Sequence, residues 1–355
     1  MIDETELAAL EALLLPFQAG ALAWTTPVAF LRARSGPALL RRPGFAEIVC
    51  EQSFKPDADA LQQAGLTVMP ELDACASRFE RVLVLPPRQR EEARALFAKA
   101  IRIAGEGGRV VGAAGNQMGA RSHEADLTQL AGGITTQSKH KCRVFWTNAL
   151  SHAQVDAARL ESWAQGDAPR TILDGRFVSR PGIFAWDRID VASELLAAAL
   201  PATLAGRAAD LGAGFGYLSQ ELLQRCGSIR ALDVYEAEHR ALALARLNLA
   251  NDAHGVPIDF RWHDVTRGLP DRYDVIVSNP PFHTRSGRDD PGLGRRFIAA
   301  AAAALNPGGR FWLVANRHLP YESVLNASFG SVRIVIERYG FKIIEAIRGD
   351  AKVRQ

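Results

Sequence analysis

Short apolar runs alternate with longer amphipathic segments from residue 207 onward. This alternation is typical of a parallel sheet that helices cover on both faces. The first expected strand ends at 209–211, and the other four span 229–234, 258–262, 274–278 and 310–315. Helices are expected over 217–225, where Gly227 is a stop signal, and over 236–250. The second half of the chain is therefore predicted to be an α/β domain.

Two β-rich runs follow the fifth expected strand, over 332–337 and 341–347, with 338–340 between them. Their spacing predicts an antiparallel hairpin. The five parallel strands and this hairpin together make a seven-stranded, Rossmann-like sheet.

A glycine-rich turn follows the first expected strand directly, with Gly212, Ala213, Gly214 and Gly216 behind Asp210. Glycines there let the backbone pass close to a ligand and point amide groups at it. A dinucleotide site usually has its third glycine three residues after the second, and here the spacing is two. We therefore expect a nucleoside cofactor with a cationic amino-acid tail beside Asp210, which suits S-adenosyl-L-methionine.

Two further acids are expected at strand ends. Asp233 is predicted to end the second strand, where an acid binds the ribose hydroxyls of a nucleoside. Asp264, followed by Val265, comes after the third strand, at the sheet edge where ligands bind. Asp264 is expected either to accept the adenine amine or to cap a helix or turn.

The fourth strand runs into Asn279, Pro280, Pro281, Phe282 and His283. The prolines fix the backbone, so the Asn279 side-chain oxygen and the Pro280 carbonyl are held in place. These two oxygens can accept both N–H bonds of an exocyclic amine and turn its lone pair toward a methyl donor. Phe282 is suited to stack on a flipped-out base and His283 to contact it. The alternative is a rigid turn with Phe282 in the core.

On these residues the second half, from about 184 to 348, resembles the class I methyltransferases. Within them it is similar to the ribosomal RNA small-subunit methyltransferase C family of guanine-N2 enzymes. The motifs that carry the resemblance are at 181–184, 212–216, 279–283, 314–316 and 319–321. The tetrapeptide 279–282 alone also occurs in adenine-N6 and protein glutamine methyltransferases, whereas His283 and the segment after the fifth strand favour the guanine-N2 group.

The resemblance implies methyl transfer from S-adenosyl-L-methionine to the N2 amine of one guanosine in ribosomal RNA, 16S of the small subunit. It implies Asn279 to Phe282 as catalytic residues. It implies cofactor contacts from the glycine turn, from the three acids with Val265, and from Phe184 and Asn279. The bulky Trp186 departs from what we expect near Phe184. A different class of function, a non-catalytic RNA-binding or ribosome-assembly factor, is disfavoured because the motifs are intact.

The first half looks like a degenerate copy of the second. Residues 79–87 match 273–281, with Leu85 where the second half has Asn279, and 30–36 replace the glycine turn with bulky side chains. Similarity at this scale suggests gene duplication. We expect a degenerate methyltransferase-like domain at 1–165 that binds no cofactor, a linker at 166–180, and a catalytic domain at 181–355. The first domain is expected to assist folding or to hold RNA.

The net charge of +3 is too small to indicate a nucleic-acid partner by itself. Local clusters carry that prediction: one lies at 139–143, and the other contains Arg285, Arg288, Arg295 and Arg296. Arg285 and Arg288 are expected to contact the RNA substrate. Four scattered cysteines, an acidic beginning and short apolar runs predict a cytoplasmic protein with no metal site and no membrane partner.

Overall fold

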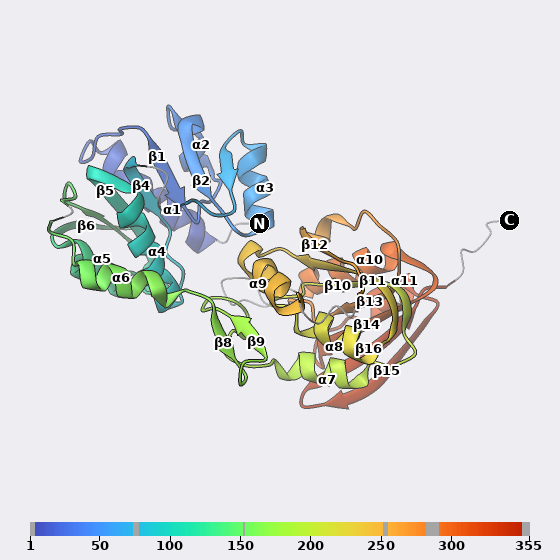
Figure 1. Ribbon diagram of the computed structural model, residues 1–355. Coiled ribbons are helices and arrows are strands. Elements are labelled where there is room, and N and C mark those ends of the chain that lie inside the picture. Colours follow the sequence, from blue (N-terminus) through green and yellow to red (C-terminus); the bar gives the residue numbers. More distant parts are fainter. Residues whose placement is uncertain (1–3, 74–77, 152, 251–254, 282–290, 350–355) are drawn as a thin grey trace. The chain divides into compact units, whose positions relative to one another are not determined.

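The computed structural model describes residues 4–73, 78–151, 153–250, 255–281 and 291–349 (Figure 1). The chain divides into two compact units. Unit 1 comprises Met1–Ala168 with Arg180–Gly182, and unit 2 comprises Pro169–Ser179 with Ile183–Gln355.

Unit 2 contains a seven-stranded sheet in the order β12-β11-β10-β13-β14-β16-β15. Every neighbouring pair is parallel except β14–β16 and β15–β16, which are antiparallel. The prediction of a seven-stranded sheet that ends in a hairpin is confirmed. The strands are β10 (Ala205–Leu211), β11 (Ser228–Glu236), β12 (Ile258–Trp262), β13 (Tyr273–Ser278), β14 (Leu305–Asn316), β15 (Ser331–Arg338) and β16 (Phe341–Ile347).

Helices cover both faces of this sheet (Figure 1). One core lies under α7 (Val191–Ala199), α8 (Tyr217–Arg225) and α9 (His239–Leu249). The other lies under α10 (Pro291–Ala304) and α11 (Glu322–Ser328). Because both faces are covered, a central strand such as β13 is buried along nearly its whole length. Its carboxyl end then emerges from the core at residue 279.

Unit 1 repeats this strand order as β3-β2-β1-β4-β5-β7-β6. Its strands are β1 (Val28–Leu31), β2 (Ile48–Glu51), β3 (Thr67–Met69), β4 (Phe79–Val84), β5 (Ala104–Gly115), β6 (Ile134–Lys139) and β7 (Cys142–Thr147). Its helices are α1 (Glu4–Gln18), α2 (Pro37–Leu40), α3 (Lys55–Gln63), α4 (Arg90–Ile103), α5 (Ala120–Ala131) and α6 (Ala157–Gly166). The duplicated fold predicted for the first half is therefore present.

The segment expected to be a linker, 166–180, contains a two-stranded hairpin of β8 (Arg170–Ile172) and β9 (Phe177–Ser179). The Asn248 side chain in α9 accepts from Val178 N at 2.7 Å and donates to Val178 O at 2.9 Å. These two bonds attach the hairpin to unit 2.

Candidate functional site

A pocket opens in unit 2 beside the carboxyl ends of β10 and β13. Three segments contribute to it: the turn before α7 with the start of that helix, the glycine turn with the start of α8, and the residue after β13. Its lining residues are Phe184, Ala185, Ile189, Asp190, Ser193, Gly212, Ala213, Gly214, Phe215, Tyr217, Leu218 and Asn279. Five of the predicted cofactor residues therefore share one pocket: Phe184, Gly212, Ala213, Gly214 and Asn279.

The glycine turn has a backbone that other residues adopt with strain. Gly212, Gly214 and Gly216 have φ values of 76°, 57° and 95°, in the left-handed region. A Cβ at Gly214 would meet nothing within 4 Å, whereas one at Gly216 would lie 3.3 Å from Ala245. Gly214 thus faces open space that a ligand can enter, and Gly216 is needed for the contact between α8 and α9.

The acid at the end of β11 is Glu236, and the prediction that Asp233 ends this strand is wrong. The strand continues for three residues past Asp233, through two buried ones. Glu236 Oε2 accepts from Gly214 N at 2.8 Å, and its Oε1 accepts from Glu238 N at 2.8 Å. Burial raises the pKa of Glu236, and these amide bonds oppose the rise. Sequence reasoning missed Glu236 because it placed this residue at the start of the helix expected over 236–250, whereas α9 begins at His239.

Asp233 instead belongs to a buried polar cluster away from the pocket lining. Its Oδ2 accepts from the Tyr273 hydroxyl at 2.6 Å and from Arg207 Nη2 at 2.8 Å. Arg261 Nη2 lies 3.3 Å from the same oxygen. Asp233 is 3% exposed, so these partners compensate the cost of burying its charge.

Asp210 lies beneath the glycine turn and is fully buried. Its Oδ2 accepts from the Ser219 hydroxyl of α8 at 2.7 Å, while its Oδ1 is buried without a partner. Burial raises the pKa of Asp210 to about 7, and the charge of Glu236 adds to the rise. An unsatisfied buried carboxylate oxygen next to a ligand loop is a place where a cationic or N–H donor group is stabilised.

Asp264 caps the short 3-10 helix Val265–Arg267: its Oδ1 accepts from Thr266 N at 2.9 Å and from the Thr266 hydroxyl at 2.7 Å. Of the two roles expected for it, capping is the one observed. Val265 is buried in the core under α10. Neither residue is among those that line the pocket.

Asn279 is held by two residues that the sequence did not single out. Its Nδ2 donates to Asp190 Oδ2 at 2.9 Å and to the Ser193 hydroxyl at 2.8 Å. Because a carboxylate only accepts, the amide nitrogen must face Asp190, which fixes the amide orientation. Among the described residues no hydrogen bond reaches Asn279 Oδ1. Asp190 also caps α7 by accepting from Ser193 N, and that capping pattern was its only signal in the sequence.

Pro280 is buried and Pro281 is exposed. The remaining predicted substrate residues, Phe282, His283, Arg285 and Arg288, lie outside the described residues. Phe184 is 67% exposed although it is a large apolar residue. Its position at the pocket is consistent with a surface that a planar ligand covers.

The corresponding place in unit 1 is filled by protein. Register pairs Leu31 with Val84 and Leu211 with Ser278, so Leu85 and Asn279 hold matching positions. Arg34 lies at the position that matches Gly214 of unit 2. It is 2% exposed and pairs with Asp57 at 2.8 Å. Leu85 is buried in the core.

Gln52 takes the place of Glu236 in unit 1. It accepts from Phe54 N, two residues on, at 2.9 Å, as Glu236 does from Glu238. Its Nε2 donates to Ala33 O at 2.7 Å. The bond to the amide two residues on is thus repeated in unit 1, whereas the second bond is donated to a carbonyl and not accepted from the amide of a glycine turn.

Among the residues that the structure describes, no group of three or more His, Cys, Asp or Glu side chains is placed to hold a metal ion. No helix in the described part of the chain has the length and hydrophobicity needed to span a bilayer.

A family model described as "Methyltransferase small domain" matches residues 174–345. Ribosomal RNA small subunit methyltransferase C of Shewanella loihica is 31% identical over 269 residues, which cover 75% of this chain and 76% of the relative. The protein of the same name from Yersinia enterocolitica is 28% identical over 288 residues, covering 81% and 79%.

A solved structure of the T. thermophilus 16S rRNA N2 methyltransferase, in complex with AdoMet and guanosine, has the same two-unit fold. The TM-score is 0.77 over 97% of this chain and 92% of that chain, at 23% identity. The identity to the Shewanella protein and the extent of the match define the family. This chain belongs to the ribosomal RNA small subunit methyltransferase C family.

Proposed function

We propose that this protein transfers a methyl group from S-adenosyl-L-methionine to the N2 amine of a guanosine in small-subunit ribosomal RNA. The observation that carries the proposal is the fixed amide of Asn279, whose Nδ2 is occupied by Asp190 and Ser193 at the edge of the glycine-turn pocket. The names of the relatives, which are small-subunit rRNA methyltransferases, support RNA as the substrate.

The glycine turn that lines the pocket, together with two acids next to that turn, fits S-adenosyl-L-methionine. Gly214 leaves open space in which a Cβ would meet no atom within 4 Å, Asp210 Oδ1 is a buried acceptor without a partner, and Glu236 is the acid at the end of β11. We assign the ribose hydroxyls to Glu236 and the cationic tail to the region of Asp210. Phe184 is proposed to cover the cofactor. When bound, S-adenosyl-L-methionine supplies an electrophilic methyl group on a sulfonium.

Asn279 acts by orientation. An exocyclic amine is a weak nucleophile because its lone pair is delocalised into the ring, so accepting its N–H bonds helps to direct that lone pair toward the donor. The Asn279 Oδ1 and the Pro280 carbonyl are the two acceptors. As the amine loses its ring conjugation, positive charge develops on the nitrogen, and these oxygen dipoles stabilise it.

Asp190 and Ser193 are positioning residues in this proposal. If the Asn279 amide were free to rotate, Nδ2 would present a donor to the substrate amine half of the time, and two donors repel. Two acceptors on Nδ2, at 2.9 Å and 2.8 Å, prevent that rotation.

We propose that a target base inside folded RNA is turned out of its stack and stacked on Phe282, with His283 beside it.

The test is methyl transfer from labelled cofactor to naked 16S rRNA, to assembled small subunits and to large subunits, followed by nucleoside analysis. N2-methylguanosine from a small-subunit substrate supports the proposal. N6-methyladenosine, or methylated glutamine in a ribosomal protein, would overturn the substrate assignment. Absence of transfer to every substrate, together with RNA binding, would favour the assembly-factor alternative.

A further inference from the structure

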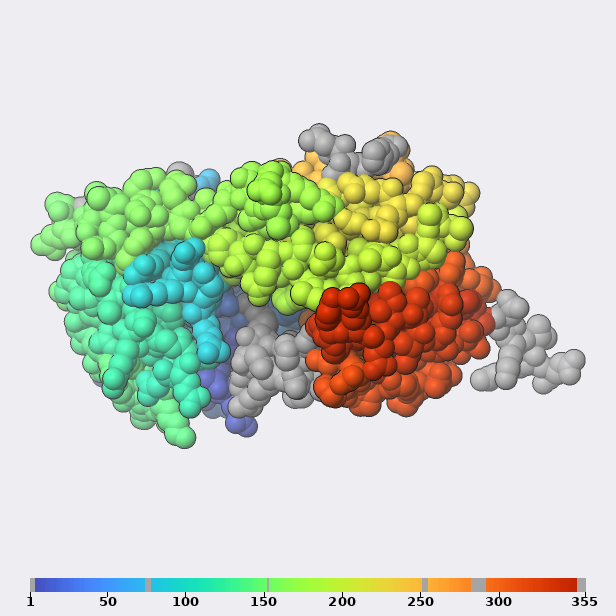
Figure 2. All heavy atoms as spheres, turned by 90° about the horizontal axis from the view of Figure 1, so that it is seen from below, coloured from blue at the N-terminus to red at the C-terminus, as the bar shows by residue number. Residues whose placement is uncertain are grey.

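Unit 1 has its own pocket, at the carboxyl edge of its sheet and away from the degenerate cofactor position. It is lined by Asn116, Gly119, Arg121, Ser122, Ser138 and Arg143. These residues come from the turn after β5, the start of α5 and the β6–β7 hairpin. The segment from β5 to β7, drawn from teal to green in Figure 2, contributes a continuous part of the surface of unit 1.

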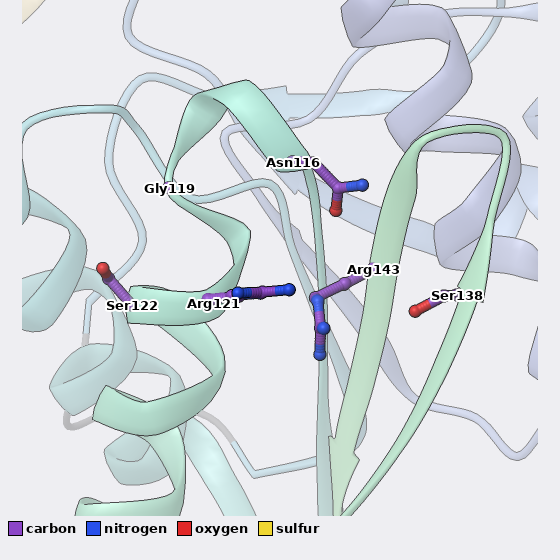
Figure 3. Close-up of a pocket in the computed structure, with 6 residues that line it drawn as sticks. All are labelled: Asn116, Gly119, Arg121, Ser122, Ser138 and Arg143. Atoms are coloured by element: carbon purple, nitrogen blue, oxygen red, sulfur yellow. The ribbon is translucent and has the colours of Figure 1, made fainter.

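Two guanidinium groups meet in this pocket. Arg121 extends from α5 toward Arg143 on β7 (Figure 3). Arg143 Nη1 donates to Glu124 Oε2 at 2.6 Å, and Glu124 Oε1 accepts from the Thr136 hydroxyl at 2.9 Å. Both oxygens of Glu124 are therefore used. No carboxylate among the described residues pairs with Arg121, so the pocket has one positive charge that the protein does not neutralise.

The matching place in unit 2 differs in this respect. Lys342 of β16 and Glu322 of α11 form an ion pair there, as Arg143 of β7 and Glu124 of α5 do in unit 1. Lys342 is 4% exposed, and its Nζ also donates to Leu319 O at 3.0 Å. The duplicated ion pair is thus present in both units. The exposed arginine of the matching turn in unit 2, Arg317, lies 3.6 Å from Glu337, whereas Arg121 has no such acid among the described residues.

The charges continue from the pocket to the tip of the β6–β7 hairpin. Lys139, His140 and Lys141 are exposed there, and Asn116 N donates to Lys141 O at 2.9 Å, which ties the hairpin tip to the pocket. Guanidinium groups bind phosphate oxygens in pairs. A row of exposed cations beside such a pair fits successive phosphates of one strand better than a single small anion.

We propose that this pocket of unit 1 binds a backbone phosphate of the RNA substrate, with Arg121 and Arg143 on its oxygens and the hairpin tip along the flanking phosphates. The inference rests on the proposed function only in taking RNA as the substrate. It gives the unit that has no open cofactor site a direct role in substrate affinity.

The test measures binding of a fluorescently labelled 16S rRNA fragment to the full chain by anisotropy, at several salt concentrations. Arg121→Glu should raise Kd roughly tenfold or more and reduce the slope of log Kd against log salt by about one. The matched control is Arg78→Glu, an exposed arginine just before β4, at the opposite edge of the same sheet, which should bind RNA as the wild type does. Circular dichroism and melting of both variants establish that they fold.

Wild-type Kd and salt slope in a folded Arg121→Glu protein would overturn the inference. Protection of Arg121 from phenylglyoxal by inorganic phosphate, with RNA affinity unchanged by the substitution, would also overturn it, because the pocket would then bind a small anion. If the wild type binds RNA through Arg121 but methylates no RNA, the proposed function is wrong and the phosphate site of unit 1 is still supported.

Discussion

Asn279 Nδ2 donates to Asp190 Oδ2 at 2.9 Å, although 89 residues separate the two in the chain. Asp190 lies at the start of α7 and Asn279 at the end of β13. Their contact brings a fixed amide to the pocket that the glycine turn forms.

Asp190→Ser should slow methyl transfer by roughly 10- to 100-fold, because the introduced hydroxyl and that of Ser193 can donate as well as accept and no longer fix the amide orientation, while serine still caps the helix. Most of the cofactor affinity should be retained. Single-turnover methylation, with Kd from calorimetry, checks both. Ser193→Ala removes one of the two acceptors and should have a smaller effect. A wild-type rate for Asp190→Ser would contradict the positioning role.

Glu236→Ala and Asp233→Asn should separate binding from stability. Loss of the hydrogen bonds that Glu236 accepts should weaken cofactor binding by roughly 10- to 100-fold. Asp233→Asn should lower the free energy of unfolding by about 1–3 kcal/mol, because Arg207 and Tyr273 lose a charged partner. Calorimetry and urea unfolding of both proteins test this. Cofactor binding that depends on Asp233 and not on Glu236 would reverse the assignment.

Cofactor affinity should rise between pH 6 and pH 8, as Asp210, whose pKa burial raises to about 7, becomes ionised and attracts the cationic cofactor. Asp210→Asn should weaken binding at pH 8 and flatten this dependence.

The stability effect of Asp210 has the opposite sign. The folded pKa is above the unfolded value, so the folded state holds the proton more tightly, and stability falls as pH rises from 3.8, the ordinary pKa of an aspartate, to about 7. The free energy of unfolding of the wild type, relative to that of Asp210→Asn, should therefore decrease as pH rises from 3.8 to about 7. Above pH 7 it should stay constant. Urea unfolding at a series of pH values tests it. A difference that is constant with pH would contradict the raised pKa.

The chain should bind one cofactor, in unit 2. Gly214→Arg introduces an arginine at the position where unit 1 has Arg34. This substitution should abolish cofactor binding. Arg34→Ala should not create a second site, because Leu85 and Gln52 still replace Asn279 and Glu236. Calorimetric stoichiometry measures both. A stoichiometry of two cofactors per wild-type chain would show that unit 1 also binds the cofactor.

The sequence predicted elements whose ends coincide with a change from apolar to polar residues or with a glycine stop signal. The strand at 258–262, the strand at 341–347 and the helix at 217–225 were predicted with the bounds that the structure has. The second strand was ended too early because Asp233 interrupts its apolar run. A buried acid can continue a strand when arginine and tyrosine partners compensate its charge, and those partners lie on other strands.

The site shows the same distinction. The glycine turn and the Asn279 segment are contiguous motifs, so sequence reasoning found them. Asp190, Ser193 and Glu236 join them only through tertiary contacts. The extra cation at Arg121 was missed for a similar reason, since no basic run surrounds it in the chain.

The most direct test of the proposed catalysis compares Asn279→Ala with Asn306→Ala. Asn306 is a matched control, because its Nδ2 also donates to a carboxylate, Asp274 Oδ1, at 2.8 Å, and it lies near the other end of the sheet in β14. The measurement is the single-turnover rate of N2-methylguanosine formation in 16S rRNA, with the cofactor Kd determined in parallel. Asn279→Ala should reduce the rate by at least about 100-fold while most of the cofactor affinity is retained, and Asn306→Ala should retain the rate. A folded Asn279→Ala protein that methylates guanosine at the wild-type rate would contradict the account.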